Sequence, residues 1–255
     1  MNKKVLLSVI IIARNEGSRI GRCLESTAWA DEKIVIDNGS TDDTAMQAKK
    51  HGAHVVEDNN HNFSEIREFG AHHATGEWLL YIDADETVTP ELRNEIVGLI
   101  HSGTTTSAFF IPRKNYYLGS LWPKKDGMVR LIRKKALVKW EGTLHEHAVI
   151  HGKIETLHNH CIHHTHRTVE EMVEKTNEWS VVEATLRFAG HHPPVSWWRL
   201  LRVMITAFTR SYVREGGWKV GGTGWIESIF QAFSMFITYA KLWEMQQNNN
   251  NKIAN

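Results

Sequence analysis

The 255-residue sequence contains only two cysteines, Cys23 and Cys161. Two thiols cannot build a disulfide framework, so the sequence favours a reducing compartment. It also lacks an excess of charge of either sign, because 30 Lys and Arg face 29 Asp and Glu, for a net charge of +1. Nucleic-acid-binding proteins are usually clearly basic. We therefore expect no nucleic-acid partner.

We also expect no cleavable signal peptide. The chain begins like a signal peptide, with Lys3 and Lys4 before a mostly apolar run. That run has no small-residue cleavage site and continues directly into Arg14, Asn15 and Glu16. A buried first strand explains it better, and we expect an unprocessed, cytoplasmic chain.

The composition supports a packed protein. Hydrophobic residues make up 42% of the chain and charged residues 23%, a balance that argues against global disorder. The length fits one large domain, or a domain with an appendage.

Strand and helix patterns alternate over roughly the first 100 residues. The expected strands are 6–12, 33–37, 53–57 and 78–83, and the expected helices end near residues 29 and 51, cover 64–74, and start at 90. Such alternation predicts right-handed βαβ units. The fold class is therefore α/β, a mixed and mainly parallel sheet flanked by helices.

Polar residues follow these strands where they end. The apolar segment 79–82 stops at Asp83-Ala84-Asp85-Glu86, and Asp37 closes an earlier strand. Parallel sheets bind ligands outside the carboxyl ends of their strands. Asp83 and Asp85, two residues apart, can direct carboxylates to one side and suit a hard divalent cation that also holds phosphate. The alternatives are an acidic turn at Asp83–Glu86 and an ordinary Asx turn at Asp37.

Several motifs carry a family resemblance. The segments IIARNE, VIDNGSTDDT and GEWLLYIDADE, together with Arg67, resemble the inverting family 2 glycosyltransferases, whose fold is the Rossmann-like GT-A fold. The segments MVRLIRKK, WEGTLHEH, HTHRTVEEMVEKTNEW and GGWKVGGTGW resemble, within that family, the enzymes that add a sugar, often glucose, to the inner core of lipopolysaccharide.

The resemblance implies a bound nucleoside-diphosphate sugar, a UDP-sugar. The residues that it implicates in binding this donor are Ala13, Glu16, Asp37, Arg67, Asp83 and Arg130. Carboxylates can accept hydrogen bonds from a base or ribose, and arginine can face phosphates. The sequence departs from the family pattern at Asn38, where a second Asp is common, and at Glu68, where an Asn is common.

The resemblance also implies a Mg²⁺ or Mn²⁺ ion bound at Asp85, with Asp83 and His163 as further candidates. The cation would bridge the diphosphate and offset charge on the leaving group. A structural zinc site is not expected, because the histidines between 158 and 166 alternate as in a strand and only Cys161 supplies sulfur.

Inverting transfer needs a base that takes the proton of the acceptor hydroxyl. The segment WEGTLHEH offers Glu141, His145, Glu146 and His147. We favour Glu146 as the base, with His145 contacting diphosphate or acceptor. The alternative is an antiparallel strand whose polar residues face water.

The carboxyl-terminal third changes character. We expect a catalytic domain over 1–165, a helical appendage over 166–245 and a disordered tail over 246–255. Trp and Phe lie along one side of the helix expected over 197–214, with Arg beside or opposite them, a pattern typical of an interfacial helix. Polar residues within 225–243 argue against a full membrane span. The appendage is expected to bind the inner face of the cytoplasmic membrane peripherally, to pack on the catalytic domain, or to form a homo-oligomer.

The leading expectation is thus a metal-dependent inverting glycosyltransferase that moves a sugar, glucose from UDP-glucose, to a lipid-linked or lipopolysaccharide-core saccharide. One alternative is an aspartyl-nucleophile phosphohydrolase with Asp83 as nucleophile and Asp85 as acid/base, although that motif usually follows the first strand of its domain. Another is a membrane-peripheral saccharide-binding protein with weak or lost catalysis.

Overall fold

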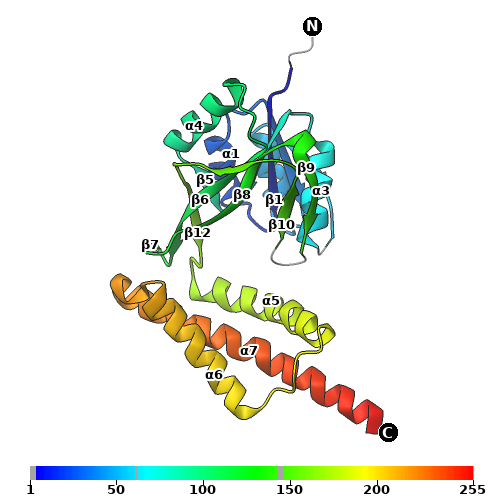
Figure 1. Cartoon of the computed structure of the whole chain (residues 1–255), viewed down its shortest axis with the longest axis vertical. Coiled ribbons are helices and arrows are strands. Elements are labelled where there is room, and N and C mark those ends of the chain that lie inside the picture. Colours follow the sequence, from blue (N-terminus) through cyan, green and yellow to red (C-terminus); the bar gives the residue numbers. More distant parts are fainter. Residues whose placement is uncertain (1–3, 61, 143–145, 255) are drawn as a thin grey trace. The chain divides into compact units, whose positions relative to one another are not determined.

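A computed structural model describes residues 4–60, 62–142 and 146–254 (Figure 1). The chain forms two compact units. Unit 1 takes Met1–Lys114 and Lys125–His163, and unit 2 takes Asn115–Lys124 and His164–Asn255. The expected boundary after residue 165 thus falls two residues beyond His163. The assignment of Asn115–Lys124 to unit 2 has no counterpart in the expected domains.

The elements follow in this order. Unit 1 contains β1 (Leu7–Ala13), α1 (Ile20–Ser26), β2 (Glu32–Asp37), α2 (Thr44–Lys50), β3 (His54–Glu57), α3 (Phe63–His73), β4 (Trp78–Asp83), β5 (Glu86–Val88), α4 (Pro90–His101), β6 (Ala108–Tyr117), β8 (Asp126–Arg133), η1 (Lys134–Ala136), β9 (Leu137–Glu141), β10 (His147–Ile150), β11 (Ile154–Thr156) and β12 (Cys161–Thr165), of which β6 and β12 continue into unit 2. Unit 2 adds β7 (Ser120–Leu121), α5 (Val169–Ala189), α6 (Trp197–Thr209), η2 (Arg210–Arg214), η3 (Gly217–Val220) and α7 (Gly221–Ala254).

The central sheet is mixed, with its parallel strands together. Its order is β3-β2-β1-β4-β8-β6-β12-β5, with β7 and β11 pairing with β6. The pairs among β1 to β4 are parallel, whereas β8 runs antiparallel to both β4 and β6. A separate hairpin joins β9 and β10. The predicted α/β fold, a mixed and mainly parallel GT-A sheet flanked by helices, is confirmed.

Side chains that alternate along the buried strands form two hydrophobic clusters in unit 1, one on each face of the sheet. Val9 and Ile11 of β1 pack into one cluster with residues of α1 and α4, while Ile10 packs into the other with Ile66 of α3. Successive side chains of a strand point to opposite faces, so a strand covered on both faces must be apolar throughout. Full burial of one such Ile side chain contributes about 1.5–3 kcal/mol.

Gly70 of α3 allows the helix to approach this sheet closely. A Cβ atom built on Gly70 would lie 2.6 Å from Cγ2 of Ile10, whereas one on Gly98 of α4 would meet nothing within 4 Å. We expect Gly70→Ala to lower the free energy of unfolding by about 1–3 kcal/mol through overpacking. Gly98→Ala, its matched control, should raise that free energy by about 0.4–1 kcal/mol, because it lowers only the entropy of the unfolded chain. Urea unfolding measures both, and equal effects would contradict the packing argument.

Unit 2 is built on three long helices. Ala184 of α5, Val203 of α6 and Leu242 of α7 meet in its core. The end of β12 is tied to α7 by His166, whose Nδ1 lies 2.9 Å from a carboxylate oxygen of the buried Glu227. No helix in the described part of the chain is both long and apolar enough to cross a membrane.

Helix α7 extends well beyond the apolar segment 225–243 at its carboxyl end. It continues to Ala254, through most of the segment for which the sequence predicts a disordered tail. That segment contains no Gly or Pro, and an existing helix propagates at little cost once it is nucleated.

Candidate active site

The carboxyl ends of the parallel strands meet at one edge of the sheet, as their sequence predicts. Ala13 of β1 is the register partner of Asp37 of β2, and Ile12 is the partner of Asp83 of β4. Three of the predicted donor-binding residues, Ala13, Asp37 and Asp83, therefore end adjacent strands. Parallel strands without this register would separate these residues along the sheet.

The loops after β1 and β2 hold each other. Asn15 has a left-handed backbone with φ of 54°; its amide donates to Oγ of Ser40 at 3.0 Å, and its Oδ1 accepts from the amide of Thr41 at 2.8 Å. Oδ1 of the buried Asp37 accepts from the amide of Ser40 at 3.0 Å, which is the Asx turn considered above. The same loop therefore forms a local turn and lines the expected donor site.

The two departures from the family pattern have structural roles. Nδ2 of Asn38 donates to the carbonyl oxygens of Asp58 and Asn60 at 2.6 and 2.7 Å, which fixes the loop after β3. Oε1 of Glu68 accepts from the amide of Trp140 at 2.8 Å, which joins α3 to β9. Each side chain thus supports a loop or strand beside the site.

Glu16 lies in the loop that follows β1. Its amide donates to Oγ1 of Thr44 at 2.8 Å, so the loop packs against the start of α2. Its carboxylate lies 3.1 Å from NH1 of Arg19. The carboxylate is therefore neutralised within its own loop.

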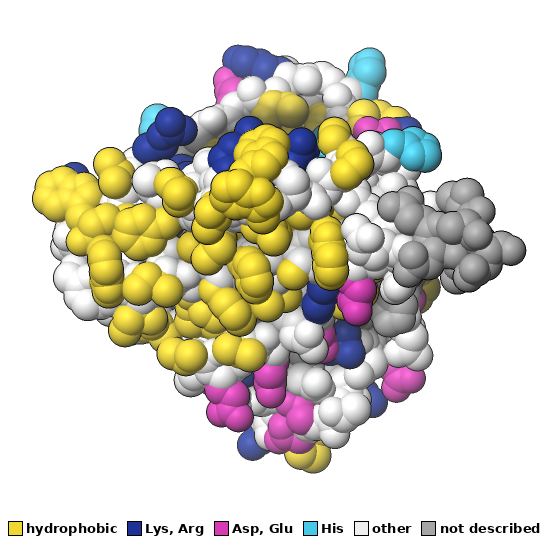
Figure 2. Space-filling view, turned by 90° about the horizontal axis from the view of Figure 1, so that it is seen from below, with side chains coloured by type: hydrophobic (Ala, Val, Ile, Leu, Met, Phe, Trp, Pro, Cys, Tyr) yellow, Lys and Arg dark blue, Asp and Glu magenta, His cyan; other side chains and the backbone are white. Residues whose placement is uncertain are grey.

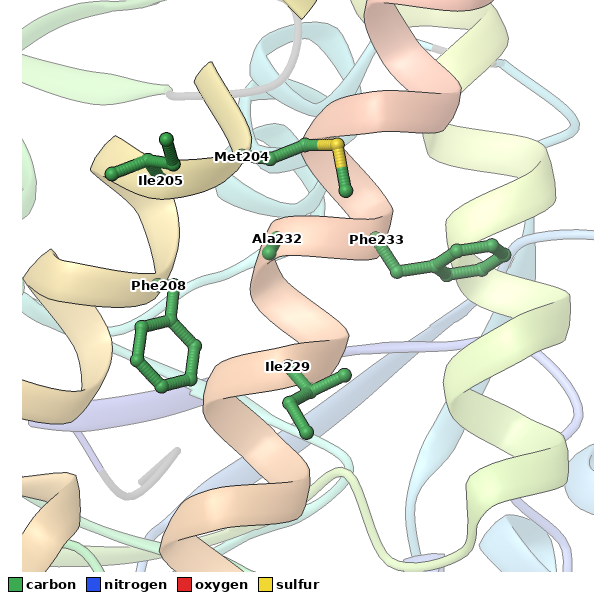
Figure 3. Close-up of a pocket in the computed structure, with 6 residues that line it drawn as sticks. All are labelled: Met204, Ile205, Phe208, Ile229, Ala232 and Phe233. Carbon is green, nitrogen blue, oxygen red and sulfur yellow. The ribbon is translucent and has the colours of Figure 1, made fainter. Parts of the chain in front are cut away.

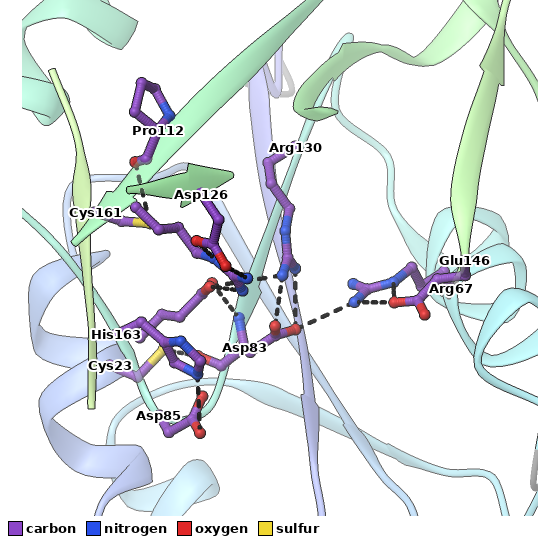
Figure 4. A network of polar contacts seen from close by, with 12 residues as sticks. Cys23, Arg67, Asp83, Asp85, Pro112, Asp126, Arg130, Glu146, Cys161 and His163 are labelled. Carbon is purple, nitrogen blue, oxygen red and sulfur yellow. Dashed lines mark hydrogen bonds and ion pairs between the residues drawn. The ribbon is translucent and has the colours of Figure 1, made fainter. Parts of the chain in front are cut away.

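Asp83 is the centre of an ion-pair network (Figure 4). Its carboxylate receives two hydrogen bonds from Arg130 of β8, one of them 2.9 Å long, and a longer one of 3.3 Å from Arg67 of α3. Burial on its own would raise the pKa of the Asp83 carboxyl, but the charges of Arg130 and Arg67 outweigh it and hold that pKa well below its usual range. Asp83 is therefore ionised and oriented by two guanidinium groups.

The network continues behind Asp83 through Glu86 and through two residues that sequence reasoning missed, Arg113 and Asp126. Glu86 is 1% exposed; its Oε2 accepts from the amide of Asp83 at 2.9 Å and its Oε1 lies 3.1 Å from NH1 of Arg113. Arg113 in turn makes a bidentate pair with Asp126, at 3.0 and 2.9 Å. Glu86 is thus neither solvated nor a free ligand. It fixes the turn that carries the two aspartates.

Arg67 connects Asp83 to the favoured base. Its Nε and NH2 both donate to Oε1 of Glu146, at 2.9 and 2.7 Å. The guanidinium also lies over the Trp140 and Tyr81 rings, 5.1 and 5.8 Å from their centroids. Arg67 is 3% exposed, so its position is fixed by packing as well as charge.

The other residues of the WEGTLHEH segment differ from Glu146. Glu141 is partly exposed and pairs with Lys139 at 2.6 Å, and His147 is exposed at the start of β10. His145 lies outside the described residues. Among the described candidates, Glu146 is therefore the one joined to Asp83.

Asp85 faces a different partner from Asp83 (Figure 4). Its Oδ2 lies 3.4 Å from Nε2 of His163 on β12, and both side chains are largely buried. Burial would lower the pKa of His163, whereas the hydrogen bond and charge of Asp85 outweigh it and raise that pKa above its usual value. The pair brings together two of the three predicted metal ligands.

The side chains at Asp85 fit a divalent cation whose remaining ligands are oxygens of a diphosphate. Two ligands bound at right angles to one Mg²⁺ lie about 3 Å apart, close to the 3.4 Å between Asp85 and His163. Asp83 differs, because guanidinium groups hold both of its oxygens. Within the described ranges no three His, Cys, Asp or Glu side chains group closely enough to hold a metal by themselves. Phosphate oxygens would have to complete the shell.

The two cysteines near the site are not nucleophiles. Sγ of Cys23 donates to the carbonyl of Asp83 at 3.5 Å, and Sγ of Cys161 donates to the carbonyl of Pro112 at 3.8 Å. Burial, followed by the nearby charge of Glu86, raises the pKa of both thiols. A protonated, buried thiol acts as a small packing residue.

The two arginines of β8 have different partners. Arg130 points to Asp83 and Glu86, while Arg133 pairs with Glu77 and covers the Trp78 ring at 4.4 Å. Arg113 of β6 and Asp126 of β8 are register partners, and no spacing within either segment predicts that they meet. Only the pairing of these strands brings them together.

Comparison with known proteins gives family matches over most of the chain. The model of the family described as glycosyl transferase family 2 matches residues 8–154, more than half of the chain. An uncharacterized glycosyltransferase of Rickettsia prowazekii is 30% identical over 264 residues, which cover 97% of this chain and 90% of that protein. A lipopolysaccharide core biosynthesis glycosyltransferase of Rhizobium meliloti is 26% identical, with coverage of 96% and 94%.

Solved structures also match part of the chain. Glucosyl-3-phosphoglycerate synthase from Mycobacterium tuberculosis, in complex with Mn²⁺, UDP-glucose and phosphoglyceric acid, is 27% identical over 44% of each chain, with a TM-score of 0.37. The family match rests on the longer sequence alignments. On that basis, this chain belongs to glycosyl transferase family 2.

Proposed function

We propose that this family 2 glycosyltransferase is a metal-dependent, inverting enzyme that moves glucose from UDP-glucose to a lipid-linked or lipopolysaccharide-core saccharide. The observation that carries the proposal is the arrangement around Asp83. The Asp85–His163 pair suits a cation, the Glu146–Arg67 pair suits a base, and Arg67 joins the second pair to Asp83. The Rhizobium relative, named for lipopolysaccharide core biosynthesis, supports the acceptor class.

In this proposal the reacting proton goes to Glu146. Both hydrogen bonds that Arg67 donates to Glu146 end on Oε1. We therefore assign Oε2 as the atom that accepts the proton of the acceptor hydroxyl. The hydroxyl oxygen then bonds to the anomeric carbon as the bond from that carbon to the UDP oxygen breaks, with its electron pair leaving on the diphosphate. Attack from the opposite face inverts the anomeric centre.

The other side chains hold the donor. Asp37 and Glu16 would accept hydrogen bonds from the base or ribose, and Ala13 would contact the base at its strand end. Arg130 is buried against Asp83 and Glu86, so we propose that it acts on the donor through Asp83. Mg²⁺ or Mn²⁺ held by Asp85 and His163 would offset the charge that develops on the diphosphate.

We also propose that the enzyme works as a peripheral protein at the inner face of the cytoplasmic membrane, where a lipid-linked acceptor would be available. The exposed aromatic residues of α6 and α7 support this placement. A homo-oligomer remains the alternative use of those residues.

The test is a ligand panel followed by a transfer assay. Purified protein with Mn²⁺ should unfold at a higher temperature in one nucleotide sugar than in the others. A ligand at 100 times its Kd adds about 2.7 kcal/mol, which corresponds to several degrees in a protein of this size. The same donor should release UDP when a truncated lipopolysaccharide acceptor is added. If no donor raises the unfolding temperature and no UDP is released with the acceptor, the proposal is refuted.

The two rival activities give different results. A phosphohydrolase would release phosphate from p-nitrophenyl phosphate with Asp83 as nucleophile, yet this carboxylate is bonded to two arginines and ends the fourth strand rather than the first. A binding protein would show the thermal shift without turnover on any acceptor. The panel and the transfer assay therefore separate all three.

A further inference from the structure

Unit 2 exposes a continuous apolar face on two adjacent helices. We call this surface the α6–α7 face and define it by six exposed side chains: Trp197, Leu201 and Ile205 of α6, and Trp225, Ile229 and Phe233 of α7. Their exposed fractions run from 41% for Phe233 to 75% for Trp197. In Figure 2 hydrophobic side chains gather over one broad area. Exposed apolar patches of this kind mark protein or membrane interaction sites.

The two helices meet along this face. Trp225 of α7 packs its ring against Phe208 and Tyr212, which follow the exposed residues along α6 and η2, at centroid distances of 5.3 and 5.1 Å. A groove of about 410 Å³ opens between the helices (Figure 3). It is lined by Met204, Ile205, Phe208, Ile229, Ala232 and Phe233. All six side chains are apolar, so the groove can take hydrocarbon but offers no side-chain polar group.

Positive charge accompanies the apolar residues. From Trp197 to Val220 the chain has five basic residues and one acid, a net charge of +4. By contrast, α5 has five acids and two basic residues, a net charge of −3. Arg202 lies over the exposed Trp198 ring at 5.5 Å and Lys219 over the exposed Trp218 ring at 5.3 Å. Cations thus lie directly over two of the exposed aromatic rings.

This charge pattern selects the occupant of the face. A second copy of the chain in a two-fold dimer would bring two segments of charge +4 together, and like charges across an interface are unfavourable. A leaflet that contains anionic lipid offers hydrocarbon for the Trp and Ile side chains and phosphate for the basic residues. Interfacial Trp side chains are typical of this boundary.

We propose that the α6–α7 face docks on a bilayer of anionic phospholipid, with the apolar groove in contact with acyl chains and Arg202 and Lys219 at the phosphates. This deepens the proposed membrane location and rests on it for its biological purpose. The binding itself needs neither donor nor acceptor. Membrane binding can therefore fail while the glycosyltransferase proposal stands, and the glycosyltransferase proposal can fail while membrane binding stands.

The test is flotation of the full chain with vesicles of phosphatidylcholine, with and without phosphatidylglycerol. The wild type should bind only the vesicles with phosphatidylglycerol, and raised salt should weaken that binding. Arg202→Glu/Lys219→Glu should weaken it by about tenfold or more, since each basic residue near such a surface contributes roughly fivefold. Trp197→Ser/Ile205→Ser should weaken it by at least about tenfold.

The matched controls lie on α5. Val181→Ser and Lys175→Glu change an exposed apolar and an exposed basic residue of that helix, and both should bind as the wild type does. A melting temperature unchanged from that of the wild type, measured without any nucleotide sugar, would show that every variant is folded. Binding that ignores phosphatidylglycerol, equal losses in the controls, or a dimer that Trp197→Ser/Ile205→Ser dissociates without any vesicle binding would overturn the proposal.

Discussion

A Glu146→Gln variant is expected to transfer sugar about 10²- to 10⁴-fold more slowly than the wild type, the usual contribution of a general base. The amide keeps an oxygen that can accept the hydrogen bonds of Arg67, so the side chain should stay in place while it loses its ability to take a proton. The loss should therefore fall on kcat, with the KM for the donor nearly unchanged. Initial rates over a range of donor concentrations measure both.

Glu141→Gln is the comparison for this variant. Glu141 lies in the same hairpin, but its side chain is 44% exposed and is paired with Lys139. Its replacement should leave the rate within about twofold, as is usual for a surface ion pair. A large loss in Glu141→Gln, or a normal rate in Glu146→Gln, would move the base to another residue of the segment.

Asp85→Asn is expected to lower transfer by about 100-fold or more and to abolish the extra thermal stabilisation that Mn²⁺ gives in the presence of UDP. The physical reason is that the amide has no charge to hold a cation, whereas even residues that only support metal ligands contribute about 10- to 100-fold. Melting temperatures with UDP alone, Mn²⁺ alone and both together isolate the metal-dependent part. That readout does not need turnover.

Asp31→Asn is the matched control for this change. Asp31 is exposed and directly precedes β2, at the end of the sheet opposite to the site. It should retain wild-type activity and the full response to Mn²⁺. Retention of the Mn²⁺ response in Asp85→Asn would show that the cation binds elsewhere.

The part of the site that follows from local sequence was predictable. Alternating strands and helices require a parallel sheet, and the apolar run 79–82 requires a buried strand that ends at Asp83. These two facts bring Asp37 and Asp83 to one edge, and the register of β1, β2 and β4 agrees. The resemblance then directed attention to Asp85 and Glu146, which composition alone would not have selected.

The partners of these residues were not predictable, because they depend on strand pairing between distant segments. Nothing local says that Arg113 of β6 faces Asp126 of β8, or that Arg130 rather than solvent occupies Asp83. The resemblance implies Asp85 as the metal ligand and keeps Asp83 as a further candidate. The fold separates them, because β8 brings an arginine to the first and β12 brings a histidine to the second.

Helix α7 also runs through residues 246–254, for which composition alone predicts a disordered tail. Gln and Asn residues are typical of disordered tails, but composition does not account for the helix that precedes them. Helix α7 is already fixed by Tyr239 and Leu242 in the core of unit 2, so the residues after it extend an existing helix rather than nucleate a new one.

The ion-pair network around Asp83 constrains how this protein can evolve. Arg113, Arg130 and Arg67 each lie between two carboxylates, and the buried Asp83 and Glu86 each have two arginine partners, so a single neutral replacement removes one cation from two carboxylates at once. Substitutions here should be strongly epistatic, each one tolerated only after a compensating change on a neighbouring strand. Drift in this part of the sequence should therefore proceed by paired replacements, and ancestral or designed variants that exchange one arginine alone should be the ones that fail to fold.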